Sequence, residues 1–149
     1  MGNKWDRYFM DIALRTAELS KDPGSKVGAV IVGNNKEILA VGYNGFPMKV
    51  NDIEPARYER PTKYLFTEHA ERNAIFHGAR RGISLSGTKL YTTLFPCADC
   101  ARAIIQVGIE EIYFLDGIEK TLKNVWEESF NAATTMLKEA DVAFFQFKF

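Results

Sequence analysis

Residues 89–115 read KLYTTLFPCADCARAIIQVGIEEIYFL, and this stretch decides the fold class. It begins with a predicted strand at Lys89–Thr93, and Pro96 then leads into a predicted helix at Ala98–Val107. A second strand is predicted at Glu111–Leu115. Strands that are joined through a helix pair in parallel, because a parallel pair needs a long crossover connection. The stretch therefore predicts an α/β fold with helices packed on a sheet.

The rest of the chain continues this alternation of helices and strands. Apolar residues at helical spacing predict helices at Trp5–Leu19, Glu68–Arg80 (with Thr67 as N-cap) and Leu122–Glu139. Runs rich in apolar β-formers predict strands at Lys26–Val32, Ile38–Tyr43 and Val142–Phe147. The polar segment 48–66 contains two prolines and is expected to be a long functional surface loop. With no linker composition, residues 1–149 are expected to form a single domain with α/β/α layers.

Composition argues against several classes of partner. Lys+Arg and Asp+Glu number 19 each, so the formal net charge is zero and no basic stripe is visible. We therefore expect no polynucleotide partner. No apolar run approaches the ~20 residues of a membrane span, and no signal-peptide pattern opens the chain. The expectation is a protein without membrane contact in the cytoplasm, or in the host cytoplasm if it is viral.

The two cysteines of the chain, Cys97 and Cys100, lie three positions apart. A disulfide between residues so close would close a small, strained loop, so the pair indicates a metal or redox site in a reducing compartment. A thioredoxin-like redox site is disfavoured because the order of elements lacks the βαβ context of such a motif.

A third candidate ligand, His69, stands at the start of another predicted helix. One imidazole and two thiolates make the three-ligand set of a catalytic zinc site, which leaves the fourth position for water. The positive partial charge of a helix N-terminus favours thiolate over thiol at both cysteines. Zinc lowers the pKa of bound water towards ~7 and so makes a nucleophile available at neutral pH.

Glu71 follows two residues after His69 and is the candidate proton shuttle. Hydrolysis of an amine on an aromatic ring needs a proton moved from water to the ring nitrogen and then to the leaving amine. The pattern H-x-E with P-C-x-x-C, in which the Glu is not a ligand, is the signature of zinc-dependent deaminases. The sequence therefore predicts hydrolytic deamination with Glu71 as the catalytic acid and base.

Three further segments extend these motifs: KVGAVIV at 26–32, GYNGFP at 42–47 and CARAIIQVGI at 100–109. With them, the chain resembles the zinc-dependent cytidine/deoxycytidylate deaminase superfamily over nearly its whole length. It resembles the deoxycytidylate (dCMP) deaminases more closely than deaminases of free nucleosides or of tRNA. The turn at 42–45 and the long loop after it carry that distinction.

This resemblance implies a cytidine-deaminase-like fold, with three α/β/α layers around a five-stranded mixed sheet. It implies zinc-dependent conversion of dCMP to dUMP and ammonia, which supplies dUMP for thymidylate synthesis. It also implies a homo-oligomer, with a hexamer favoured. Regulation would come from dCTP as activator and dTTP as inhibitor, with Mg²⁺ on the triphosphate.

The same resemblance assigns roles to residues outside the zinc motifs. Asn44 is expected to contact the sugar of the substrate, and Ser25 and Lys26 are placed to meet its phosphate. The effector and specificity candidates belong to the glycine-rich turn and to the end of the second long helix: Gly42, Tyr43, Gly45 and Arg80.

Other interpretations stay open on the residues alone. The chain could be a deaminase of another small substrate (a nucleoside, guanine or a riboflavin precursor), a tRNA or single-strand deaminase, or a non-catalytic nucleotide-sensing zinc module. Glu71 argues against the last, because a scaffold needs no carboxylate there. Lys26 has a plainer role as a strand-end charge, Arg80 as a complement to the helix dipole, and Asn44 as a turn residue. His77 is expected to be a partly exposed helix histidine rather than a second metal ligand.

Overall fold

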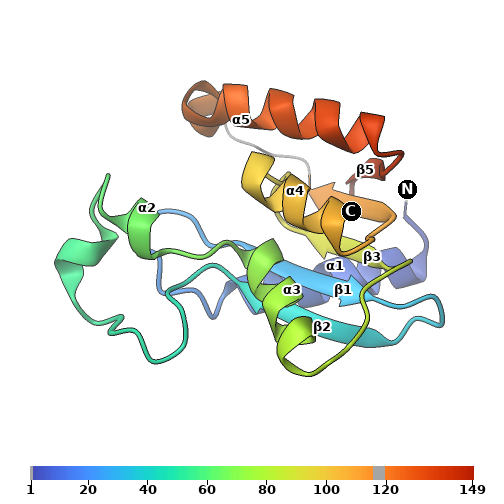
Figure 1. Cartoon of the computed structure of the whole chain (residues 1–149), viewed down its shortest axis with the longest axis horizontal. Coiled ribbons are helices and arrows are strands. Elements are labelled where there is room, and N and C mark those ends of the chain that lie inside the picture. Colours follow the sequence, from blue (N-terminus) through green and yellow to red (C-terminus); the bar gives the residue numbers. More distant parts are fainter. Residues whose placement is uncertain (1, 116–119) are drawn as a thin grey trace.

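The computed structural model describes residues 2–115 and 120–149 and shows a five-stranded sheet between helices (Figure 1). The strands are β1 (Gly28–Val32), β2 (Ile38–Tyr43), β3 (Lys89–Thr92), β4 (Glu111–Leu115) and β5 (Ala143–Phe147). The helices are α1 (Lys4–Ala17), α2 (Lys63–Phe66), α3 (Ala70–Arg80), α4 (Ala98–Gln106) and α5 (Lys120–Glu139), with a 3-10 helix η1 at Pro55–Tyr58. The order of long helices and strands confirms the prediction, with bounds that differ by at most two residues.

The sheet is mixed, with strand order β2-β1-β3-β4-β5. β1 pairs antiparallel with both β2 and β3, whereas β3, β4 and β5 run parallel. The parallel pairs are those that a helix connects, as residues 89–115 predict. In the parallel register Tyr91 lies opposite Tyr113, which in turn lies opposite Phe145.

Helices cover both faces of the sheet, which confirms the three-layer arrangement. On one face α1 buries Phe9 and Met10 against Val30 and Tyr91. On the other face α3, α4 and α5 enclose the larger core, in which Ile104 and similar side chains are fully buried. Figure 1 shows α1 behind the sheet and α3 and α4 in front of it. Full burial of each large apolar side chain stabilises the fold by about 1.5–3 kcal/mol.

Contact between β2 and α3 is made by backbone, because Gly42 has no side chain. A Cβ at Gly42 would lie 2.4 Å from the carbonyl oxygen of Ala70 and 2.4 Å from the amide nitrogen of Ala74. No such contact is sterically allowed, so the missing side chain sets how close the first turn of α3 comes to the sheet. That turn carries the H-x-E motif.

The segment 48–66 is not the structureless loop that its composition predicts. It contains η1 and the four-residue helix α2, and Tyr58 of η1 stacks on Phe46 with ring centroids 4.6 Å apart. The Tyr58 hydroxyl also donates a hydrogen bond to the carbonyl oxygen of Asp52. These local contacts order a segment whose sequence shows no helical or strand period.

Thr67 is not the N-cap of α3, contrary to the prediction. It ends α2, its Oγ1 is buried without a hydrogen-bond partner, and His69 takes the N-cap position two residues later. The tertiary contact between Gly45 and Glu68, a two-residue β-bridge, explains the difference because it holds the chain extended up to the helix. In the described ranges 2–115 and 120–149, no helix has both the length and the apolarity to cross a bilayer.

Candidate catalytic metal centre

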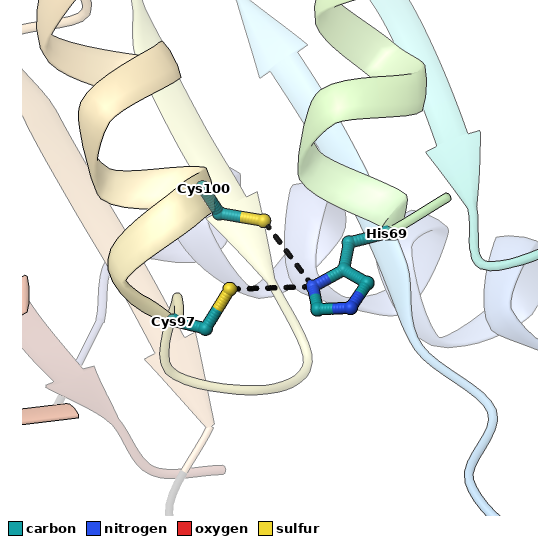
Figure 2. Close-up of side chains that lie close together, drawn as sticks. All are labelled: His69, Cys97 and Cys100. Atoms are coloured by element: carbon teal, nitrogen blue, oxygen red, sulfur yellow. Dashed lines mark hydrogen bonds between the residues drawn. The ribbon is translucent and has the colours of Figure 1, made fainter. Parts of the chain in front are cut away.

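The three predicted metal ligands converge at two helix N-termini. His69 is the N-cap residue of α3, and Cys97 is the N-cap residue of α4, with Cys100 one turn further along. The two sulfur atoms lie 3.3 Å (Cys97) and 3.5 Å (Cys100) from Nδ1 of His69. Figure 2 shows both thiols and the imidazole nitrogen pointing toward one another across the gap between the helices. The predicted spacing therefore produces one ligand cluster.

The donor set fits zinc. The three ligand atoms lie within 4.8 Å of one another, and both cysteines are buried. Two thiolates and one imidazole are ligands that zinc binds in tetrahedral sites, and three protein ligands leave one position open to solvent or substrate. No other cluster of three such side chains occurs in the described part of the chain. His77 is not part of it, because its Nδ1 lies 2.6 Å from the carbonyl oxygen of Val41.

The surroundings lower the pKa of one cysteine and raise that of the other, whereas the sequence predicts thiolates at both. A hydrogen bond from the Cys100 thiol lowers the pKa of Cys97 to about 4, and the His69 imidazole acts in the same direction. The same pairing, with burial, raises the pKa of Cys100 well above its ordinary value. A hydrogen bond to Cys97 raises the pKa of His69. Without metal the cluster thus holds protons that a cation must displace, so metal affinity rises with pH.

Glu71 lies beside the cluster but is not one of its ligands. Its side chain is 4 % exposed, its Oε2 is 3.5 Å from Cys100 Sγ, and its Oε1 is 3.5 Å from the Thr92 hydroxyl. Burial raises the pKa of this carboxyl. A buried carboxyl with a raised pKa, next to a metal site, has the environment of a general acid and base.

A cleft opens over the cluster and reaches a second group of polar side chains. His69, Glu71 and Cys97 line the cleft, together with Asp22, Ser25, Asn44, Arg60 and Lys63. Because the metal ligands and the polar group share one cavity, a small molecule held by the polar group can present an atom to the metal centre.

Aromatic rings supply the apolar wall of this cleft. The ring centroid of Trp126 on α5 lies 6.1 Å from that of His69, edge on. Tyr64 of α2 packs edge on against Trp126 at 5.8 Å, and Phe95 and Phe130 also line the cleft. Flat apolar walls with a few polar groups suit the binding of an aromatic base.

Of the predicted substrate residues, Ser25 and Asn44 line the cleft and Lys26 does not. Lys26 is exposed, since successive side chains of an extended segment point to opposite sides and its neighbours Ser25 and Val27 face the cavity. Asn44 is 7 % exposed and holds the entering loop: its Oδ1 accepts from the amide of Val27 and its Nδ2 donates to the carbonyl of Ser25, both at 2.8 Å.

The predicted effector residues are divided by the structure. Tyr43 and Gly45 line a second cavity, whereas Gly42 is buried against α3. Arg80 is exposed in the last turn of α3 and lines neither cavity. The second cavity shares Asp22 and Thr67 with the cleft, so these two side chains form part of a common wall.

Sequence reasoning missed the cleft residues of segment 48–66 and of α5. Arg60, Lys63 and Tyr64 belong to a polar stretch in which no period or motif marks them. Trp126 is visible in the sequence only as an aromatic residue of an amphipathic helix. The two prolines and the length of the loop were the available signal, and they point to function without naming residues.

Comparison with known proteins agrees with this geometry. Residues 3–116 match the family model described as cytidine and deoxycytidylate deaminase zinc-binding region. A probable deoxycytidylate deaminase of Drosophila melanogaster is 46% identical over 121 residues, which are 74% of this chain and 59% of the fly protein. The deoxycytidylate deaminase of Mus musculus is 38% identical over 149 residues, covering 97% of this chain and 80% of the mouse protein. The chain thus spans less than two thirds of the fly relative's length.

A solved structure extends the similarity to the whole fold. The dCMP deaminase of the cyanophage S-TIM5, in complex with dCMP and dUMP, superposes with a TM-score of 0.78 at 26% sequence identity. The match covers 99% of each chain. With the zinc-binding family model spanning residues 3–116 and the ligand cluster in place, the chain belongs to the cytidine and deoxycytidylate deaminase family.

Proposed function

We propose that this chain hydrolyses dCMP to dUMP and ammonia. The observation that carries the proposal is the buried carboxylate of Glu71, 3.5 Å from a metal-ligating sulfur at the floor of an aromatic-walled cleft. A structural zinc site has no use for a buried carboxyl group at this place. Support for the substrate comes from the relatives named deoxycytidylate deaminase and from the cyanophage enzyme that binds dCMP and dUMP.

Different residues of the chain hold the metal, transfer protons and bind the base. His69, Cys97 and Cys100 would hold the zinc ion, which when bound supplies Lewis-acid activation of a water molecule. Glu71 accepts a proton from the attacking water as oxygen adds to carbon C4 of the base, and delivers it to the ring nitrogen N3. A second proton passes through Glu71 to the amine, which leaves as ammonia while the carbonyl of dUMP forms. The aromatic wall around Trp126 holds the base and keeps bulk water out.

Ammonia release from dCMP by the zinc-loaded protein tests this proposal. We expect turnover with dCMP and little or none with guanine, adenosine or a riboflavin precursor in the same assay. Deamination of guanine or a riboflavin precursor, with dCMP inert, would move the chain to another branch of the family. No ammonia from any of them, with dCTP present or absent, would favour a nucleotide-sensing module.

We further propose that the second cavity binds a regulatory nucleotide, with dCTP as activator, dTTP as inhibitor and Mg²⁺ on the triphosphate. Its lining supports this proposal, because Tyr43 and Gly45 of the glycine-rich turn lie there beside the Lys21–Asp52 ion pair of 2.8 Å. A hexamer in the cytoplasm is part of the same proposal. Velocity against dCMP at several dCTP and dTTP concentrations, with light scattering for the mass, tests it.

A further inference from the structure

A second cluster of charged side chains lies in the cleft with the metal site and takes no part in proton transfer. Lys63, at the start of α2, is buried and its Nζ lies 3.0 Å from Asp22 Oδ2 and 3.2 Å from Oδ1. The Lys63 and Asp22 side chains are only 11% and 4% exposed. Burying a charged pair costs solvation energy that the attraction between the two charges seldom repays, so a buried pair at the wall of a cavity is a candidate for ligand binding.

The Asp22 carboxylate is already hydrogen-bonded within the protein. Its Oδ1 accepts hydrogen bonds from the backbone amides of Gly24 (2.8 Å) and Ser25 (3.2 Å) in addition to Lys63. Asp22 therefore fixes both the Lys63 ammonium and the turn that carries Ser25 into the cleft. An ammonium has three donors, and the one carboxylate leaves donors of Lys63 for a ligand.

Arg60 brings a further positive charge to the same cavity. It lines the cleft three residues before Lys63, and it forms no ion pair or hydrogen bond with any residue that the structure describes. Two cations against the single carboxylate of Asp22 leave this part of the cleft with a net positive charge. The guanidinium has a planar fork of donors that matches phosphate oxygens, and an ammonium adds a point charge.

We propose that Arg60 and Lys63 bind the 5′-phosphate of the nucleotide and set the preference for the monophosphate over the free nucleoside. This inference rests on the proposed deaminase function and assigns the specificity of the same site. The phosphate contact is thus assigned to two residues of segment 48–66 in place of the predicted Lys26, which does not line the cavity. Ser25 contributes its hydroxyl from the turn that Asp22 holds, and Asp22 acts as a positioning residue for Lys63.

Arg60→Ala in the zinc-loaded enzyme gives the test, since Arg60 is exposed and its truncation leaves no buried charge unpaired. Loss of one charge-assisted contact lowers kcat/KM for dCMP roughly 10- to 100-fold. The kcat/KM for deoxycytidine stays within about twofold of the wild-type value, because deoxycytidine has no phosphate and never makes that contact. Arg60→Lys keeps the charge and recovers part of the loss. The matched control is Arg81→Ala, which removes an exposed arginine outside the cleft and leaves both values unchanged.

The ratio of kcat/KM for dCMP to kcat/KM for deoxycytidine tests the role of Lys63. Lys63→Met leaves Asp22 buried and unpaired, so a general loss of stability lowers both rates, whereas loss of the phosphate contact lowers only the rate with dCMP. Asp22→Asn combined with Lys63→Met removes both charges and separates the two effects. A dCMP-to-deoxycytidine ratio unchanged in Arg60→Ala and in the double variant would overturn the inference.

A second test measures the binding of the reaction products, dUMP and deoxyuridine, and so does not depend on turnover. Calorimetric titration compares dUMP with deoxyuridine on the wild type and on Arg60→Ala. We expect the wild type to prefer dUMP and the variant to lose most of that preference. If the wild type released no ammonia from dCMP, the proposed function would be wrong, yet the binding comparison would still decide the phosphate assignment. Equal preference for dUMP in both proteins would contradict it.

Discussion

The Oε2 atom of Glu71 lies 3.5 Å from Sγ of Cys100, although the two residues belong to different helices. The contact exists because α3 and α4 begin side by side and each carries its motif in its first turn. A proton-transfer group is thereby placed within reach of any ligand on the metal, without occupying a coordination position. The relationship links the geometry of the fold to the chemistry of the site.

Zinc and the fold are expected to depend on one another through Cys100. Cys100 is completely buried, so Cys100→Ala removes a ligand inside the core. Purified variant should contain less than a stoichiometric amount of zinc and unfold at a lower temperature than the wild type. Saturation of a site at 100 times its Kd stabilises the folded state by about 2.7 kcal/mol, which the variant cannot gain. Metal analysis and thermal unfolding check this, and chelation of the wild type should reproduce the shift.

Gly42 is expected to be essential for the packing of β2 against α3, whereas Gly45 is expected to tolerate a side chain. Gly42→Ala forces a Cβ to 2.4 Å from backbone atoms of α3, and overpacking of this kind costs about 1–3 kcal/mol or more. Gly45→Ala places its Cβ 3.7 Å from the Tyr43 ring, an ordinary contact. Urea denaturation of the two variants should show a large loss for the first and a small change for the second. Equal stabilities would mean that α3 does not approach β2 as closely as described.

Asn44 is expected to act on both stability and substrate binding. Asn44→Ala removes two 2.8 Å hydrogen bonds to the backbone of the loop before β1, at a cost of about 1–3 kcal/mol. The loosened loop carries Ser25, so KM for dCMP should rise as well. Asn34→Ala, at an exposed turn residue, is the control and should match the wild type. A variant of wild-type stability with a raised KM would show that Asn44 only contacts substrate.

Alkaline pH is expected to destabilise the protein through Tyr91. Burial raises the pKa of Tyr91, and its hydroxyl donates a 2.7 Å hydrogen bond to Asp6. Above pH ~10 the unfolded chain loses the phenolic proton while the folded chain keeps it. The unfolded state then binds fewer protons, so the free energy of unfolding falls as pH rises.

Tyr91→Phe should therefore reduce this loss above pH ~10, and the part that remains comes from Tyr113, whose pKa burial also raises. At neutral pH the same variant is less stable by about 0.5–1.5 kcal/mol, because the hydrogen bond to Asp6 is gone. Urea midpoints at pH 8, 10 and 11 measure both effects. Tyr8→Phe, at a half-exposed position of α1, should keep the steep pH dependence of the wild type. The same steepness in Tyr91→Phe would rule out Tyr91 as the source.

The metal centre could be predicted from the sequence because each of its two motifs is local to the start of one helix. His69, Cys97 and Cys100 sit in the first turns of two helices, and strand-helix periodicity fixes where those helices begin to within two residues. The parallel pairing of β3, β4 and β5 also follows from the connections, since a helix joins each of these pairs. The place of β1 between β2 and β3 does not, because β2 and β3 are joined through α3 and are not neighbours. Only the relative approach of α3 and α4 is tertiary, and the shared chemistry of the ligands implies it.

The substrate end of the cleft could not be predicted in the same way. Arg60 and Lys63 reach the cavity through the path of segment 48–66, which depends on contacts such as the stacking of Tyr58 on Phe46. No spacing rule relates that path to the sheet. Of the predicted neighbours Ser25 and Lys26, only Ser25 lines the cleft, because alternation along an extended segment decides which side chains face the cavity.

Comparison of Glu71→Gln with the wild type tests the central claim most directly. Both proteins are loaded with zinc, their metal content is measured, and ammonia release from dCMP is followed at neutral pH. Glu128→Gln, at an exposed glutamate of α5, serves as the control. We expect equal zinc in all three proteins, with turnover reduced by roughly 10²- to 10⁴-fold in Glu71→Gln alone. Undiminished turnover in Glu71→Gln with full zinc content would contradict the role of Glu71 as proton shuttle.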